Sequence, residues 1–206
     1  MNEILRLFPD LTPRQTSQLE ALRDLYTDWN GKINVISRKD IGNLYEHHVL
    51  HSLAIALALH PTAGTEILDF GTGGGFPGIP LAILWPDCRF HLIDGTGKKI
   101  LVVNEVAKAI GLDNVRATHI RGEEERGKYD FVVSRAVMPL PDLVRVVRKN
   151  ISTRQRNAIG NGILCLKGGD LQAETAPFRR YVEITPLSTW LCGEWFKEKH
   201  LIYLPL

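Results

Sequence analysis

The first third of the chain carries apolar residues at the three- and four-residue spacing of a helix. The apolar residues that share one helix face are Leu19, Leu22, Leu25, Tyr26 and Trp29. The segment T-P-R-Q at 12–15 supplies a threonine cap, a proline at the first helical position and a glutamine at the third. A second helix is expected to begin near Asp40 and to end before the proline at 61. The pattern predicts a helical extension over residues 1–64 that packs on the rest of the chain.

From residue 66 the pattern changes to short apolar runs that alternate with helical stretches. The predicted strands are 66–70, 89–94, 115–120, 129–136 and 162–167. The predicted helices between them are 77–85, 98–110 and 139–149. This alternation predicts right-handed βαβ units, and so a mostly parallel sheet with helices on both faces. Two further runs, 181–185 and 200–204, lack a clear helix between them and predict an antiparallel C-terminal strand pair. The expected fold is therefore α/β and Rossmann-like over residues 65–206.

Composition narrows the class of protein. The chain has 206 residues, of which 44% are hydrophobic and 23% charged, as in ordinary folded domains. The formal net charge is only +2, so an anionic partner requires a local basic patch. Cys88, Cys165 and Cys192 are far apart and form no C-x-x-C pair, which argues against a disulfide framework or a zinc-thiolate site. Without a membrane-spanning run or a signal peptide, a cytoplasmic protein is expected.

The densest chemical signal is the run I-L-D-F-G-T-G-G-G-F-P-G at 67–78. An apolar strand leads here into a glycine-rich turn and then into a helix. Glycine allows positive φ and a close approach of the backbone to a ligand, and the helix start offers free N–H groups. Ligands of open α/β sheets bind at the carboxyl ends of the strands. A cofactor site is therefore expected at this turn.

Two cofactors compete for this turn. The glycines at 73, 75 and 78 fit the dinucleotide pattern G-x-G-x-x-G, with Asp94 at a suitable distance to bind a ribose. The same turn also fits an acidic residue followed by G-x-G-x-G, the usual form of an S-adenosylmethionine pocket. The carboxylate of Asp69 suits the cationic amino group of a methionine moiety, whereas it would repel a pyrophosphate. We therefore expect S-adenosylmethionine, with Asp94 accepting hydrogen bonds from the ribose hydroxyls.

Seven segments carry a resemblance to a known family. In chain order they are W-N-G-K-I-N-V-I-S at 29–37, H-V-L-H-S at 48–52, D-F-G-T-G-G-G-F-P-G-I-P-L at 69–81, L-I-D-G-T-G-K-K at 92–99, R-G-E-E at 121–124, V-S-R-A at 133–136 and L-K-G at 166–168. Together they resemble the bacterial small-subunit (16S) ribosomal RNA guanine-N7 methyltransferases, the glucose-inhibited division protein B family. The resemblance implies the methyltransferase fold, with S-adenosylmethionine as methyl donor and small-subunit ribosomal RNA, or its ribonucleoprotein particle, as substrate.

The resemblance also implies site residues. Gly71 and Phe76 would line the cofactor, Gly122 and Glu123 would hold its adenine side, and Arg135 would lie near its methionine end and the incoming guanine. The full set expected to bind the cofactor is Asp69, Gly71, Gly73, Gly75, Phe76, Asp94, Gly122, Glu123 and Arg135. Three positions depart from the family pattern. They are His51 in place of a frequent Asp, Gly95 in place of Ser, and Gly122 in place of a small apolar residue.

Basic residues indicate where RNA binds. The stretch between 143 and 169 holds six cations and no acid. Such a stretch is usually a solvated face, but beside a methyl-donor pocket it favours a surface for RNA phosphates. The residues expected to contact RNA are Arg38, His48, Lys98, Arg121, Lys167 and Lys199. Trp195 and Phe196 are candidates either for stacking on a base or for the core. His47 and His51 share a helix face, but no third ligand accompanies them, so no metal is expected.

The implied reaction needs no general base, because N7 of guanine carries a lone pair and no proton. We therefore expect Arg135 to act by orienting the guanine, through O6 or a phosphate rather than through N7, with Arg121 or Lys167 as alternates. Three other functions remain open at this point. They are a nicotinamide-dependent oxidoreductase, a methyltransferase for another RNA, a small molecule or a protein, and a non-catalytic RNA-binding module. A monomer is expected.

Overall fold

The computed structural model describes all 206 residues and contains one seven-stranded sheet in the order β3-β2-β1-β4-β5-β7-β6. The strands are β1 (Glu66–Phe70), β2 (Arg89–Asp94), β3 (Val115–His119), β4 (Phe131–Arg135), β5 (Gly162–Gly168), β6 (Glu183–Pro186) and β7 (Lys199–Pro205). The first five strands are parallel, and β7 runs antiparallel to both β5 and β6. The predicted α/β fold, with its antiparallel C-terminal pair, is confirmed.

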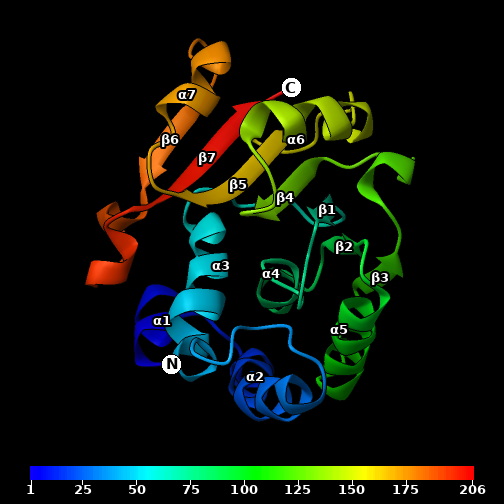
Figure 1. The fold of residues 1–206 in the computed structure, drawn as a ribbon, viewed down its shortest axis with the longest axis vertical. Coiled ribbons are helices and arrows are strands. Elements are labelled where there is room, and N and C mark those ends of the chain that lie inside the picture. Colours follow the sequence, from blue (N-terminus) through cyan, green and yellow to red (C-terminus); the bar gives the residue numbers. More distant parts are fainter.

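Helices cover both faces of this sheet (Figure 1). The α-helices are α1 (Asn2–Leu7), α2 (Pro13–Lys32), α3 (His51–Leu53), α4 (Gly78–Leu84), α5 (Gly97–Ala109), α6 (Leu140–Val147) and α7 (Gln172–Thr175). One face packs against the N-terminal helices together with α4 and α5, and the other packs against α6. Short 3-10 turns complete the chain at η4 (Gly122–Glu124), η5 (Arg148–Asn150), η6 (Ala176–Phe178), η7 (Leu187–Thr189) and η8 (Glu194–Phe196). None of the helices is both long and apolar enough to cross a membrane.

Strand β1 shows how the sheet directs side chains. Ile67 belongs to the apolar cluster that includes α4, whereas Leu68 and Phe70 belong to the cluster that includes α6. Because side chains alternate along a strand, Asp69 lies on the same face as Ile67. The carboxylate is therefore directed toward the helix that follows the glycine turn.

The helical extension shares one apolar core with the sheet. Helix α2 begins as predicted, with the Thr12 hydroxyl accepting a hydrogen bond from the Gln15 backbone N–H, and it ends at Lys32. Leu19, Leu22 and Tyr26 are buried in the cluster that also contains residues of β1, β2 and β4. The Tyr26 hydroxyl donates a 2.5 Å hydrogen bond to the carbonyl of Gly74 in the glycine turn. The extension therefore contacts the expected cofactor turn directly.

Three sequence predictions about helices and strands need correction. Helix α1 precedes the predicted first helix and was missed. The second predicted helix is not uniform, because it consists of η1 (Ile41–Asn43), the π-helix η2 (Leu44–Leu50), α3 and η3 (Ala54–Leu57). A π-helix has i→i+5 hydrogen bonds, and in η2 the buried residues Val49 and Leu50 come five and six positions after Leu44 rather than three and four. Strands β4 and β6 each begin two residues later than predicted.

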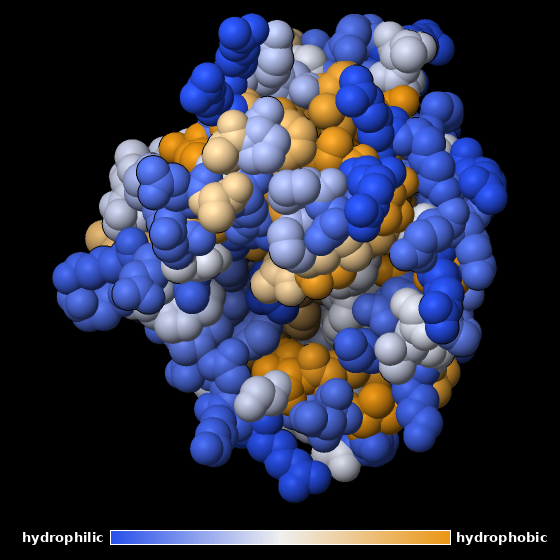
Figure 2. All heavy atoms as spheres, turned by 45° about the horizontal axis from the view of Figure 1, so that its top comes forward, coloured by the Kyte–Doolittle hydropathy of each residue, from blue (hydrophilic) through white to orange (hydrophobic).

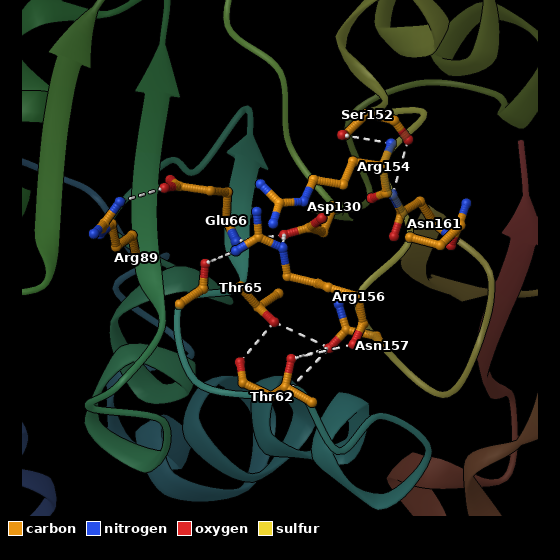
Figure 3. Close-up of polar contacts among 12 residues, drawn as sticks. Thr62, Thr65, Glu66, Arg89, Asp130, Ser152, Arg154, Arg156, Asn157 and Asn161 are labelled. Carbon is orange, nitrogen blue, oxygen red and sulfur yellow. Dashed lines mark hydrogen bonds and ion pairs between the residues drawn. The ribbon is translucent and has the colours of Figure 1, made fainter.

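The basic loop between η5 and β5 closes the amino-terminal end of the sheet (Figure 3). Asp130, only 1% exposed, accepts hydrogen bonds from the Glu66 backbone N–H at 2.9 Å and pairs with Arg156 Nε at 3.2 Å. The side-chain oxygen Oδ1 of Asn157 accepts hydrogen bonds from the Thr62 backbone N–H and from the Thr65 hydroxyl. Arg156 therefore neutralises a buried carboxylate. The residue is also exposed, so an RNA surface along the basic stretch stays a prediction.

The outer surface carries few large apolar side chains. Hydrophilic residues dominate the face seen in Figure 2, with apolar atoms between them and around a central hollow. The large apolar residues that are exposed come from different elements, and they are Leu5, Leu101, Val137, Tyr181 and Ile184. Scattered residues of this kind are normal for a folded surface.

Replacement of Gly162 is expected to weaken the junction of β5 and β7. A Cβ at this position would lie 2.2 Å from the Leu204 carbonyl oxygen and 2.8 Å from Pro205 Cα, so the two strands must move apart. We expect Gly162→Ala to lower the free energy of unfolding by about 1–3 kcal/mol, the usual cost of overpacking. Urea unfolding measures this change in the free energy of unfolding. Gly160→Ala is the control, because its nearest neighbour would be Pro205 Cβ at 3.4 Å. Equal stability of the two variants would contradict the prediction.

Candidate functional site

A cavity of about 390 Å³ opens at the carboxyl ends of β1, β2 and β3. Its lining residues are Phe70, Gly71, Ile93, Asp94, Gly95, Thr96, Ile120, Arg121, Gly122, Glu123, Val137 and Met138. Four of the residues predicted to bind the cofactor are among them, namely Gly71, Asp94, Gly122 and Glu123. The cavity therefore lies where α/β sheets bind their ligands.

The turn after β1 has a shape that requires glycine. Gly71, Gly73 and Gly75 have φ angles of 70°, 58° and 101°, which residues with a side chain rarely adopt. A Cβ on Gly71 would lie 2.6 Å from Val137 Cγ2, and one on Gly75 would lie 2.7 Å from a side-chain carbon of Ile79. Nothing lies within 4 Å of the Cβ position of Gly73. The turn is thus closely packed at both ends and open in its middle.

Asp94 joins the turn to the end of the neighbouring strand. Its Oδ2 accepts a 3.0 Å hydrogen bond from the Gly73 N–H, and its Oδ1 accepts a 2.8 Å bond from the Thr96 N–H. A carboxylate oxygen has two acceptor sites, so each oxygen retains one for a hydroxyl donor. Asp94 also lines the cavity. Its geometry suits the predicted role of binding a ribose.

The turn η4, which follows β3, forms another wall of the cavity. A Cβ on Gly122 would lie 2.0 Å from the Phe70 ring, so only glycine permits this approach. Glu123 follows on the same turn and lines the cavity. The departure from the family pattern at Gly122 therefore fits the packing of this chain.

Asp69 occupies a different place from the one expected. Its carboxylate is fully buried and does not line the cavity, because β1 directs it beneath the glycine turn. Oδ2 accepts bonds from the Thr72 hydroxyl at 2.6 Å and the Gly78 N–H at 2.7 Å, whereas Oδ1 has no partner. Burial raises the pKa of Asp69 to about 7, although these donors and Arg135 favour the ionised form. The carboxylate holds the turn from inside, and direct binding of a cofactor amino group stays a prediction.

Arg135 lies at the end of β4, beside this turn but outside the cavity lining. Its guanidinium carbon lies 5.3 Å from the centre of the Phe76 ring. Nη1 donates to the His47 carbonyl at 3.1 Å, and Nη2 donates to His48 Nδ1 at 3.0 Å. Burial lowers the pKa of Arg135 to about 10, with Asp69 opposing the shift, so the side chain is cationic at neutral pH. Phe76, 2% exposed, is therefore packed between the extension and Arg135 rather than on the cavity wall.

Four of the six residues expected to contact RNA fall into two groups, exposed and buried. Arg38, Lys98 and Arg121 are exposed and take part in no ion pair. Lys167, in contrast, is 9% exposed and donates to the Met138 carbonyl at 2.5 Å and to Glu174 at 2.6 Å. The expectation that Lys167 binds RNA directly is not met by this placement, because Glu174 already neutralises its charge.

The two C-terminal aromatic residues, Trp195 and Phe196, both have partners within the fold. Phe196 is fully buried, which decides for the core rather than for base stacking. The Trp195 ring stacks on His47 with centroids 4.2 Å apart, and Lys199 Nζ lies 4.8 Å from the Trp195 ring. Trp195 therefore already has aromatic and cationic partners. No group of three or more potential metal ligands is present among the described residues.

Several residues at the site were not predicted. Thr96, Ile120, Val137 and Met138 line the cavity. Thr96 lies within the segment at 92–99 but was given no role, and the other three lie outside every quoted motif. Ala136 has a φ of 52° although it is not glycine. It follows Arg135 directly and turns the chain so that Val137 packs on Gly71. The only sequence signal was the position of this segment at a strand end.

Comparison with known proteins agrees with the fold and the motifs. Residues 15–191 match the family described as GidB, rRNA small subunit methyltransferase G. A ribosomal RNA small subunit methyltransferase G of Bacteroides thetaiotaomicron is 59% identical over 203 residues, which cover 98% of each chain. A protein of the same name from Parabacteroides distasonis is 60% identical over 199 residues, covering 97% of this chain and 86% of that protein.

Solved structures share the fold at much lower identity. Precorrin-6y C5,15-methyltransferase from Geobacter metallireducens has a TM-score of 0.56 at 14% identity, covering 84% of this chain and 90% of that chain. A mutant of MtNAS in complex with S-adenosylmethionine has a TM-score of 0.58 at 13% identity, covering 93% and 76% of the two chains. Likeness at this identity shows the fold alone. Because the family match spans most of the chain and the relatives match it nearly end to end, the chain belongs to the rRNA small subunit methyltransferase G family.

Proposed function

We propose that this protein transfers a methyl group from S-adenosylmethionine to N7 of a guanine in small-subunit ribosomal RNA, as a monomer in the cytoplasm. The observation that carries the proposal is the cavity built on the left-handed glycine turn, in a chain of this family. The names of the relatives supply the class of substrate. No observation favours an oxidoreductase, a small-molecule methyltransferase or a non-catalytic RNA-binding module.

The residues at the cavity fit the proposed cofactor. The carboxylate of Asp94 keeps free acceptor sites for the two ribose hydroxyls. No atom lies within 4 Å of the Cβ position of Gly73, so a ligand has room beside this residue. Gly122 and Glu123 would border the adenine side through backbone atoms. When bound, S-adenosylmethionine supplies a methyl group on a cationic sulfur, which is an electrophile.

The chain's own contribution to the reaction is orientation. N7 of guanine has a lone pair and loses no proton, so no side chain must act as a base. Arg135 is cationic and uses two of its N–H groups on the extension, which leaves others for O6 or a phosphate of the substrate. Holding two reactants in the reactive geometry supplies a large share of a rate enhancement. A guanidinium on N7 itself would oppose the reaction, because the methylated ring is cationic.

Asp94→Asn is expected to weaken cofactor binding. The substitution replaces a charged acceptor of hydroxyl hydrogen bonds with an amide, a loss of about 1.5–3 kcal/mol or roughly 10- to 100-fold in Kd. Calorimetric titration with S-adenosylmethionine measures the change. The matched control is Asp113→Asn, because Asp113 precedes the amino-terminal end of β3, whereas Asp94 lies at the carboxyl end of β2. An unchanged Kd in Asp94→Asn would exclude this carboxylate from the cofactor site.

Arg135→Ala is expected to slow methylation strongly while the fold and cofactor binding persist. Loss of the orienting guanidinium should reduce the rate at least about 100-fold, the scale of a misplaced reactant. Incubation with labelled methyl donor and RNA lacking the modification, followed by digestion, measures the 7-methylguanosine formed. Arg6→Ala, which removes an exposed arginine paired with Glu3, is the control. Near-normal turnover by Arg135→Ala would remove this residue from the site.

RNA binding is expected to weaken steeply with salt through the exposed cations. Each lost phosphate contact should reduce the slope of log K against log salt concentration by about 0.7–0.9. Filter binding of unmodified small-subunit RNA at several salt concentrations tests this in Arg121→Ala and Lys98→Ala. Arg89→Ala removes a cation that is exposed and paired with Glu66, at the amino-terminal end of β2. If Arg121→Ala and Lys98→Ala keep the wild-type slope, the RNA does not contact these two residues.

A further inference from the structure

We propose that Asp40 is a positioning residue for methyl transfer, because its carboxylate fixes the tautomer in which His48 accepts a hydrogen bond from Arg135. The inference rests on the proposed function, in which Arg135 orients the guanine. It gives a role to a residue that the sequence marked only as the start of a helix. It also assigns His48 to Arg135 rather than to direct contact with RNA.

The carboxylate of Asp40 is bound by two adjacent histidines. Oδ1 lies 2.5 Å from His47 Nδ1, and Oδ2 lies 2.7 Å from His48 Nε2. An ionised carboxylate only accepts hydrogen bonds, so both of these ring nitrogens carry a proton. The two histidine contacts lower the pKa of Asp40 against the effect of burial, which keeps the group ionised. Asp40 therefore dictates that His48 is protonated at Nε2.

The opposite nitrogen of His48 meets Arg135. Nδ1 lies 3.0 Å from Arg135 Nη2, and a guanidinium can only donate. His48 Nδ1 must therefore carry a lone pair. Burial, followed by the nearby charge of Arg135, lowers the pKa of His48 to about 4, so the ring is neutral near pH 7. Both partners select the same neutral tautomer, with the proton on Nε2.

The Asp40 side chain makes no capping hydrogen bond to a backbone N–H of the helix that it precedes. An aspartate at the start of a helix normally accepts a bond from a backbone N–H of the first turn. Asp40 occupies that position before η1, yet its side chain makes no capping hydrogen bond. Its oxygens accept hydrogen bonds from His47 and His48, and Oδ1 also accepts a longer bond of 3.4 Å from the Asn43 side chain in η1. The side chain therefore makes its shortest contacts with the residues next to Arg135.

The contacts confine Arg135 on several sides. The extension supplies two acceptors, the His47 carbonyl and His48 Nδ1, and the Phe76 ring lies against the guanidinium. The His48 ring also contacts Phe76, with centroids 5.3 Å apart. If His48 carried its proton on Nδ1, one of these acceptors would become a donor that faces a cation. The guanidinium would then move, and a shift of about 1 Å in a reacting geometry costs on the order of 100-fold in rate.

The test combines Asp40→Asn with Arg135→Ala in a double-mutant cycle. Single-turnover formation of 7-methylguanosine is measured with saturating S-adenosylmethionine in the wild type, both single variants and the double variant. We expect Asp40→Asn to lower the rate about 10- to 100-fold, with less than a twofold change in cofactor Kd. In the Arg135→Ala background the same substitution should cost less than about twofold, because its target is gone. Asp28→Asn, at an exposed aspartate paired with Lys32, is the matched control and should keep the wild-type rate.

Two further readouts separate positioning from a structural role. Nitrogen NMR shifts of the His48 ring should show one protonated and one bare nitrogen in the wild type, and exchange between tautomers in Asp40→Asn. His48→Asn, whose amide oxygen can replace Nδ1 as an acceptor, should retain more activity than His48→Leu. Equal losses from Asp40→Asn in the two backgrounds, or an unchanged His48 tautomer, would overturn the inference while leaving the proposed function intact. A wild-type protein that forms no 7-methylguanosine would overturn both.

Discussion

The site depends on the conformation of the glycine turn after β1, and two carboxylates hold that conformation. Asp69 binds the Thr72 hydroxyl and the Gly78 N–H from inside the fold, whereas Asp94 binds the Gly73 N–H from the neighbouring strand. Fixing three glycines in left-handed conformations costs conformational entropy on folding, because glycine loses more backbone freedom than any other residue. The charge-assisted hydrogen bonds offset that cost. Because the carboxylates come from adjacent parallel strands, the turn is set by the sheet itself.

The helical extension completes the site rather than merely covering the sheet. Tyr26 of α2 binds the Gly74 carbonyl, and the segment around His48 binds Arg135 at the end of β4. The extension and the sheet also share one apolar cluster, so their relative position is fixed by packing as well as by these polar contacts. The contact between Tyr26 and the glycine turn therefore persists as long as the shared apolar core stays packed.

The parts of the site that are local in sequence were predictable, and those made by packing were not. The strand, turn and helix around residues 66–84 follow from apolar runs and glycines within a few positions of one another. Arg135 and His48 lie 87 positions apart, and their contact depends on how the extension docks. His48 lies in the π-helix η2, a rare element whose buried residues do not follow the three- and four-residue spacing used to predict helices. For Lys167, composition revealed a positive charge but not that Glu174, seven positions later, neutralises it.

Two buried ionisable groups at the site, Asp69 and Arg135, influence each other's charge without forming an ion pair. Burial removes much of the hydration of Arg135 and all of the solvent exposure of Asp69. Burying either charge without a compensating group would lower the free energy of unfolding. Each shifts the pKa of the other toward the ionised form. Because the pKa of Asp69 is still raised by burial to about 7, its ionisation opposes stability increasingly as pH rises from the ordinary value toward 7. The charge of Asp69 therefore carries a cost in stability near neutral pH, and what the carboxylate supplies in return is the pair of hydrogen bonds to Thr72 and Gly78 that hold the glycine turn.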